Sequence, residues 1–250
     1  MSAFAPEIIT HIGVFPVTNT LINTLLVDAG LLGATFYITK KMKPIPHYFQ
    51  NTIEMVFEGF YNLAQGVCGE KVKKIFPWFM SFFLFILLAN WSGLIPGIGT
   101  FGFYETVEGK KELIPFIRNA TSDLNTTFGL ALISLVATHT LAIQAVGWKE
   151  YLRRYFSINP VYLYVGILEI IGEFTKIISL SFRLFGNIFA GEVVLSTISG
   201  IFAFLFPIPF LLLEIIVGLV QALVFSMLTM VFMSVLMTPH HAEEHTKAHE

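Results

Sequence analysis

Apolar residues gather in long runs along this chain, and several of these runs are long enough to cross a membrane as helices. A membrane-spanning helix needs about 20 mainly apolar residues. Five runs meet this requirement and predict membrane helices over residues 21–39, 78–95, 128–146, 161–206 and 209–237. Pro207 and Pro209 separate the last two runs, because proline ends one helix and can begin the next.

An amphipathic segment lies between the first two runs. Over residues 45–67, apolar residues such as Ile53, Val56 and Phe60 recur at helical spacing, with polar residues between them. This segment is too polar to span a membrane. We predict a helix that lies flat at the membrane interface, and a short buried helix is the alternative.

The basic residues predict the orientation of the chain. Five crossings place the two ends on opposite sides of the membrane. Basic clusters within residues 40–43, 71–74 and 149–154 all fall on one side, whereas the basic residues at 110–118 are diluted by acids. By the tendency of cytoplasmic loops to be positive, residues 1–20 form an outer segment and residues 238–250 a cytoplasmic tail.

These patterns predict an all-α integral membrane protein with a single membrane domain over residues 1–250. Composition agrees, since 55% of the residues are hydrophobic, only 13% are charged and the mean hydropathy is +0.72. The net charge of -2 gives no indication of a nucleic acid partner, and the single cysteine, Cys68, excludes an internal disulfide. The tail contains four histidines that could bind a metal, but a solvated tail without metal is the preferred interpretation.

Ionisable residues within the fourth run are costly in a membrane, so each is a functional hypothesis. Most of them step by three or four positions and share one narrow helix face with a polar amide, in the set Glu169, Glu173, Lys176, Arg183 and Asn187. Glu173 and Lys176 are also spaced as a structural ion pair, and the sequence leaves that alternative open.

Glu192 lies about half a turn away from this polar face and must have a different neighbour. In the last run, Glu214, Gly218 and Gln221 share a face. We expect Glu214 and Gln221 to meet Glu192 across a helix interface, with Gly218 permitting close approach.

Arg183 is the residue most out of place in this apolar run. Arginine cannot lose its proton, and estimates for a lone arginine at the membrane centre run from about 3 to beyond 10 kcal/mol. The nearest acid on the same face, Glu173, is about 15 Å away along the helix, so an anionic group on a partner chain is implied.

The last two runs are also too long for upright spans. As helices they would measure about 70 and 43 Å, against a hydrocarbon core of about 30 Å. Either the first of them breaks, at Gly186 or Gly191, or both are steeply tilted and expose one face to a large neighbour.

The segment Ser179-Leu-Ser-Phe-Arg183-Leu-Phe-Gly-Asn187-Ile-Phe-Ala-Gly-Glu192 closely resembles the signature of subunit a of the F-type ATP synthase membrane sector. The resemblance extends to Gln221-Ala-Leu-Val-Phe, to Asp123-Leu-Asn and to the stretch from Asn90 to Pro96. It implies a stator in a bacterial cell membrane that works beside a rotating c-ring, with peripheral-stalk b subunits and the whole synthase complex as partners. Such a subunit translocates H⁺ or Na⁺, needs no cofactor and is not an enzyme by itself.

The resemblance also implies a role for each matching residue. Arg183 would face the ring carboxylate. The outer half-channel would contain Asp123, Asn187, Glu192, Glu214 and Gln221, and the inner half-channel would contain Glu169, Glu173 and Ser179, with Lys176 beside them. Many relatives have histidine where this chain has Glu214, which keeps a proton-handling group in place.

Two other functions remain alternatives at this stage. A self-contained ion channel or antiporter would favour repeated halves with broken helices, and the sequence has no such repeat. A purely structural anchor has no reason to place Arg183, Glu192 and Glu214 within its spans. His139 in the third run could join a proton path, but a hydrogen bond between packed helices is the preferred interpretation.

Overall fold

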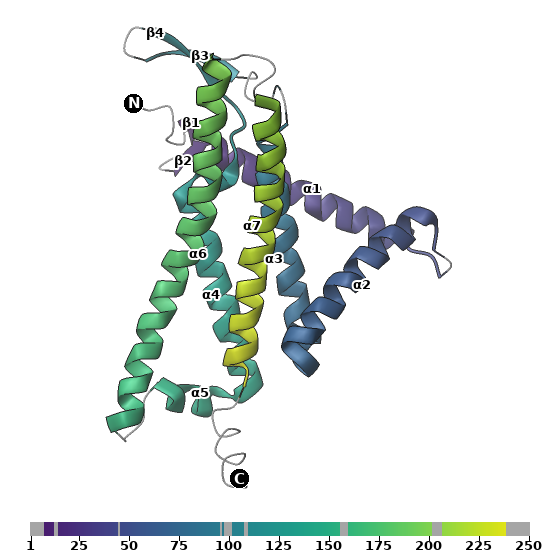
Figure 1. Ribbon diagram of the computed structural model, residues 1–250, viewed down its shortest axis with the longest axis vertical. Coiled ribbons are helices and arrows are strands. Elements are labelled where there is room, and N and C mark those ends of the chain that lie inside the picture. Colours follow the sequence, from purple (N-terminus) through teal and green to yellow (C-terminus); the bar gives the residue numbers. More distant parts are fainter. Residues whose placement is uncertain are drawn as a thin grey trace. The chain divides into compact units, whose positions relative to one another are not determined.

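The computed structural model describes residues 8–12, 15–44, 46–95, 97, 102–107, 110–155, 160–201 and 207–238, and most of these residues are helical (Figure 1). The helices are α1 (Asn19–Lys41), α2 (Tyr48–Cys68), α3 (Val72–Ser92), α4 (Leu124–Val146), α5 (Trp148–Tyr155), α6 (Pro160–Ile201) and α7 (Pro207–Leu236). Short 3₁₀ turns occur at Gly69–Lys71 and Ala120–Ser122. Each segment predicted to be helical therefore contains a helix.

Two hairpins were not predicted from the sequence. Strand β1 (Ile8–Ile12) pairs antiparallel with β2 (Phe15–Thr18), and β3 (Gly102–Val107) pairs antiparallel with β4 (Lys110–Pro115). Strands of four to six residues give too short an alternation to be distinguished from polar loops. The histidine-rich tail falls at residues 239–250, outside the described residues.

Among the described residues, four helical segments are long and apolar enough to cross a membrane: Asn19–Lys41, Tyr48–Ser92, Leu124–Val146 and Pro207–Leu236. Helix α6 is not among these four segments. The chain is thus a multi-pass membrane protein, while its fifth crossing and the tilt of its last two helices stay predictions.

Helix α6 runs unbroken from Pro160 to Ile201, so the predicted break at Gly186 or Gly191 does not occur. Its 42 residues would extend over about 63 Å. Helix α7 begins at Pro207, where proline is well tolerated because the first helical N–H has no partner within the helix.

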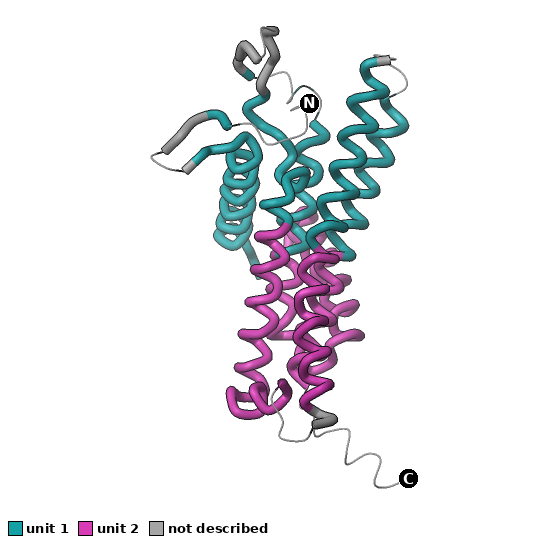
Figure 2. Tube along the Cα trace, turned by 90° about the vertical axis from the view of Figure 1, so that its left-hand side faces the viewer, with its two compact units in different colours: residues 1–44, 82–127, 181–224 teal, residues 45–81, 128–180, 225–250 magenta. Residues whose placement is uncertain are grey.

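The chain divides into two compact units (Figure 2). Unit 1 comprises residues 1–44, 82–127 and 181–224, and unit 2 comprises residues 45–81, 128–180 and 225–250. Fully buried Ile86 and Leu184 belong to the core of unit 1, whereas Phe79 and Met230 belong to that of unit 2. Within unit 2, the apolar face of α2 is largely exposed, with Tyr48 the most exposed, which favours an interfacial over a buried helix.

Candidate functional site

Arg183 lies on α6 in unit 1 with its side chain exposed. The next residue, Leu184, is completely buried, and so is Ile188 one turn further along. Phe182, beside the arginine, is 56% exposed. This part of α6 therefore packs Leu184 and Ile188 inward and presents Arg183 outward, beside the exposed side chains of Phe182 and Asn187.

A buried ion pair lies in unit 1 between Arg118 and Glu192. Arg118 precedes the 3₁₀ turn before α4, and its Nε and terminal nitrogen donate to the two carboxylate oxygens of Glu192, each at 3.3 Å. The side chain of Arg118 is 8% exposed and that of Glu192 34%. A bidentate pair of this kind is strong and directional, so it fixes the Glu192 carboxylate toward Arg118.

The polar contacts between α6 and α7 agree in part with those predicted, because Glu214 lies near enough to Glu192 for the two charges to interact. Gln221 accepts a hydrogen bond from Asn187 Nδ2 at 2.7 Å, whereas we expected it to meet Glu192. Glu214 packs against Gly191, where an added Cβ would lie 1.9 Å from a carboxylate oxygen. The glycine that permits close approach to Glu214 is therefore Gly191, because the backbone of α6 comes nearer to that carboxylate than the sequence pattern indicated.

Gly218 permits a different approach, from α3. Asn90 Nδ2 donates to the Gly218 carbonyl oxygen at 3.0 Å, and Trp91 Nε1 donates to that of Ile215 at 3.1 Å. A Cβ on Gly218 would lie only 3.2 Å from Asn90 Cβ. Two side chains of α3 thus hold the stretch of α7 that carries Glu214.

Asp123 caps the N-terminus of α4. Its Oδ1 accepts the backbone N–H of Asn125 at 2.9 Å, and its Oδ2 accepts the Thr20 hydroxyl of α1 at 3.1 Å. An aspartate at this position satisfies an N–H group that has no partner within the helix. Asp123 therefore has a structural role that the resemblance did not indicate.

Several buried polar residues of unit 1 were missed as site residues by the sequence analysis. Asn23 donates to Ser92 Oγ at 2.8 Å and to the Arg118 carbonyl oxygen at 2.9 Å, and Thr121 donates to Asn90 Oδ1 at 2.6 Å. A polar stretch before an apolar run resembles a solvated loop, so its burial had no signal in the sequence. Asn23 and Asn90, amides inside apolar runs, could have been singled out.

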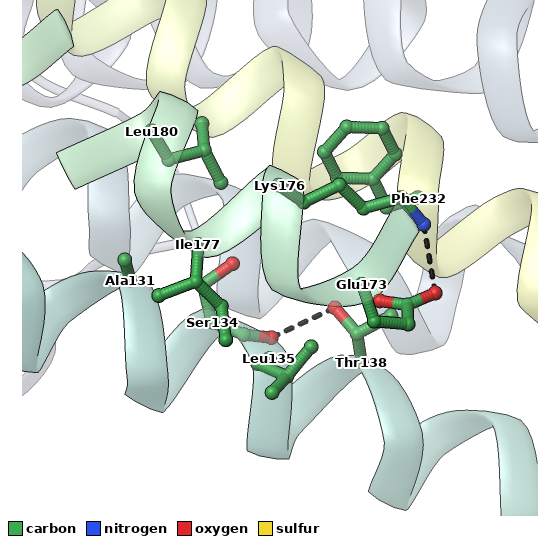
Figure 3. Close-up of a pocket in the computed structure, with 9 residues that line it drawn as sticks. All are labelled: Ala131, Ser134, Leu135, Thr138, Glu173, Lys176, Ile177, Leu180 and Phe232. Atoms are coloured by element: carbon green, nitrogen blue, oxygen red, sulfur yellow. Dashed lines mark hydrogen bonds and ion pairs between the residues drawn. The ribbon is translucent and has the colours of Figure 1, made fainter. Parts of the chain in front are cut away.

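A second group of charged residues lies in unit 2, around Glu173 on α6 (Figure 3). Lys176 Nζ lies 2.8 Å from Glu173 Oε1, so the ion pair left open as an alternative is present. His139 Nε2 of α4 lies 3.8 Å from Glu173 Oε2, and Arg154 Nε of α5 lies 2.6 Å from Glu169 Oε1. Three helices of unit 2 therefore contribute charged or titratable groups to one place.

The Glu173 side chain borders a small pocket between α4, α6 and α7. Ser134 and Thr138 contribute polar groups to its lining, and Lys176 lies over the ring of Phe232 at 4.5 Å from the centroid. The pocket has room for about one water molecule. A carboxylate beside such a space can exchange a proton with water.

His139 makes the hydrogen bond between helices that the sequence analysis preferred. Its Nδ1 lies 2.8 Å from the Tyr151 hydroxyl on α5. Gly147, with φ of 89°, allows the chain to turn between α4 and α5, and this turn returns Tyr151 toward His139. Burial raises the pKa of the Tyr151 and Tyr155 hydroxyls, so both stay protonated.

The remaining predicted residue, Ser179, lies exposed on α6 in unit 2. In the part of the chain that the structure describes, no group of three or more histidines, cysteines or acids is arranged to bind a metal ion. The titratable side chains around Glu192 and Glu173 can instead exchange protons and hold charge.

Comparison with known proteins identifies the family. The family model described as ATP synthase A chain matches residues 20–234. ATP synthase subunit a of Moorella thermoacetica is 31% identical over 234 residues, covering 94% of this chain and 97% of the relative. That of Gloeobacter violaceus is 35% identical, covering 84% and 80%, and that of Legionella pneumophila is 31% identical, covering 89% and 88%.

These matches confirm the resemblance seen in the signature around Arg183, and they extend it over most of the chain. They do not favour a self-contained ion channel or antiporter. The relatives carry the name of one subunit of a synthase, in agreement with the prediction that the chain is a component of that complex and not an enzyme by itself. The chain belongs to the ATP synthase A-chain family, the family of ATP synthase subunit a.

Proposed function

We propose that this chain is the ion-translocating stator of a rotary F-type ATP synthase. In this role it provides two offset half-channels to a rotating c-ring and couples ion flow to ATP synthesis. The observation that carries the proposal is the exposure of Arg183 on α6, beside the exposed side chain of Phe182. A permanent positive charge at the surface of a membrane helix can meet a carboxylate that a partner brings there.

Arg183 acts on the ring by electrostatics. A ring carboxylate that enters its field is favoured as the anion, because a charge pair at 4 Å contributes roughly 4 kcal/mol at an effective dielectric near 20. The carboxylate releases its ion to one half-channel, accepts another from the second half-channel and then crosses the lipid as a neutral group. Arg183 also repels cations that would pass directly between the half-channels.

We assign the two half-channels to the two polar groups of the chain. The outer half-channel uses Asp123, Asn187, Glu192, Glu214 and Gln221, all of which belong to unit 1. The inner half-channel uses Glu169, Glu173, Lys176 and Ser179, all of which belong to unit 2. Ion pairs with Arg118 and with Lys176 keep Glu192 and Glu173 oriented, which supports these assignments.

The proposal includes a topology and partners. Helices α1, α3, α4, α6 and α7 are the five crossings, α2 lies at the interface, and α6 and α7 are tilted against the ring. The outer N-terminal segment and cytoplasmic tail follow from the basic clusters, in a bacterial cell membrane. Peripheral-stalk b subunits hold the chain against rotation, and an electrical gradient contributes about 2.3 kcal/mol per charge per 100 mV.

The test is Arg183→Ala in the whole complex, reconstituted into vesicles. We expect ATP-driven ion pumping to be abolished while the subunits still assemble, because the ring carboxylate loses the charge that keeps it ionised. Arg153→Ala, which removes an exposed arginine from α5, is the matched control and should pump normally. Normal pumping by the Arg183 variant would overturn the proposed function.

A further inference from the structure

We propose that His139 holds and passes the transported proton on the inner route, between Glu173 of α6 and water. The inference rests on the proposed function, because it adds a group to the inner half-channel. It also commits that route to protons, since an imidazole carries a proton in both directions but cannot pass Na⁺ along.

The geometry gives His139 a proton partner on each ring nitrogen. Nε2 lies 3.8 Å from Glu173 Oε2, and Nδ1 lies 2.8 Å from the Tyr151 hydroxyl. A small rotation of either side chain brings Nε2 and the carboxylate within hydrogen-bonding distance. The side chains of His139 and Glu173 are 23% and 10% exposed, so direct contact with bulk water is restricted.

The Tyr151 hydroxyl can serve both protonation states of the imidazole, because a hydroxyl either donates or accepts. When the ring is neutral with its proton on Nδ1, Tyr151 accepts that N–H and the Nε2 lone pair faces Glu173. When the ring is protonated, Nδ1–H still donates to Tyr151. Tyr151 is therefore a positioning residue that keeps Nε2 directed at the acid.

The step balances with these two groups and water. On ion release, a neutral Glu173 carboxyl gives its proton to Nε2, and a carboxylate and an imidazolium are left side by side. The imidazolium then gives the Nε2 proton to a water molecule. Uptake runs the same steps in reverse, and no other reactant is required.

The charged groups around His139 make both states accessible. From α6, the acids Glu169 and Glu173 and the base Lys176 lie near the imidazole, and Lys176 pairs with Glu173 at 2.8 Å. From α5, Tyr151 binds the ring and Arg154 neutralises Glu169 at 2.6 Å. From α7, the ring of Phe232 faces Lys176. His139 therefore lies among both acids and bases, which suits a group that must load and unload a proton.

The experiment measures ATP-driven proton pumping by the whole complex in vesicles, as a function of pH on the side from which protons are loaded. The unmodified complex should lose rate as pH rises through the titration of His139, because the imidazole no longer loads. His139→Gln should remove this alkaline limb and slow pumping about tenfold. Loss of a positioned proton-transfer group usually slows a reaction by about a hundredfold or more, but here water can partly take over proton transfer from the imidazole. His47→Gln, the same change at an exposed histidine before α2, is the control.

A pH profile of unchanged shape in His139→Gln overturns the inference, even if the rate falls, because lost packing would slow pumping equally at every pH. If the His139→Gln complex does not assemble, Tyr151→Phe provides the test of the inference. It should shift the alkaline limb, and an unshifted limb overturns the inference. Loss of pumping in Arg183→Ala together with an unchanged His139→Gln profile would leave the proposed function standing without His139.

Discussion

A single glycine determines where the Glu214 carboxylate can lie. The carboxylate occupies the space that Gly191 leaves open on α6, and a methyl group there would lie 1.9 Å from one oxygen. A contact that short is impossible, so the carboxylate or the helix must move. The position of the acid in unit 1 thus depends on a residue that has no chemistry of its own.

Gly191→Ala should therefore impair ATP-driven pumping strongly while Gly186→Ala does not. Both changes replace a glycine inside α6 with alanine and raise helix propensity by about 1 kcal/mol, but an added Cβ at Gly186 meets nothing within 4 Å. Pumping rates of the two reconstituted variants, compared at equal subunit content, check this. Equal rates would mean that the place of Glu214 against Gly191 is unimportant for translocation.

Individual residues of the site differ in how well they could be predicted from the sequence. Arg183 could be singled out because a permanent charge in an apolar run is costly wherever the helices pack. The partners of Glu192 and Gln221 could not be predicted, since Arg118 is 74 positions from Glu192 and Asn187 is 34 positions from Gln221. Helical periodicity gives the face of each residue, whereas contacts between helices depend on tertiary packing.

At the scale of elements, the junction between α1 and α4 connects stability with ion transport. Asp123 caps α4 with one oxygen and accepts the Thr20 hydroxyl of α1 with the other. The cap and the proposed outer-channel role make different demands on the side chain. A cap requires only an acceptor oxygen, whereas ion transfer requires a carboxylate.

Two substitutions at Asp123 separate these roles. Asp123→Asn should retain the thermal stability of the purified complex, because asparagine is an equally good cap, but should slow pumping because an amide, unlike a carboxylate, cannot take up and release a proton near neutral pH. Asp123→Ala should lower both the thermal stability and the pumping rate. The lost cap and the lost hydrogen bond should cost about 1–2 kcal/mol of stability. The measurements are the unfolding midpoints and pumping rates of the two variants. Full pumping by Asp123→Asn would mean that Asp123 only caps α4 and takes no part in ion transfer.

The elements themselves were predictable where the apolar signal is long. Helices α1, α3, α4 and α7 each contain about six turns or more, so their apolar runs outweigh local exceptions. Helix α5 has eight residues and was missed, although it supplies Tyr151 and Arg154 to the charged group of unit 2. Elements this short contribute little to a hydropathy pattern even when they carry important side chains.

At the scale of the whole molecule, the outward face of α6 near Arg183 should lie against another protein and not against lipid. In the proposed function Arg183 faces the ring carboxylate, and Phe182 is its neighbour on the exposed surface. Exposed Val136 on α4 is equally apolar, and its helix contains no aspartate, glutamate, lysine or arginine. The two positions therefore discriminate between a face that binds a ring and a face that only contacts lipid.

Cysteine cross-linking in the native membrane makes this comparison. In a Cys68→Ser background, Phe182→Cys should form a disulfide with a cysteine placed beside the ring carboxylate, because their Cα atoms come within the roughly 4.4–6.8 Å that a disulfide requires. Val136→Cys should form none with the same ring. Cross-links from neither position, or equally from both, would contradict the proposed docking of Arg183. If this face of α6 is held against the ring, Phe182→Cys comes repeatedly within reach of the ring cysteine, whereas Val136→Cys stays in lipid.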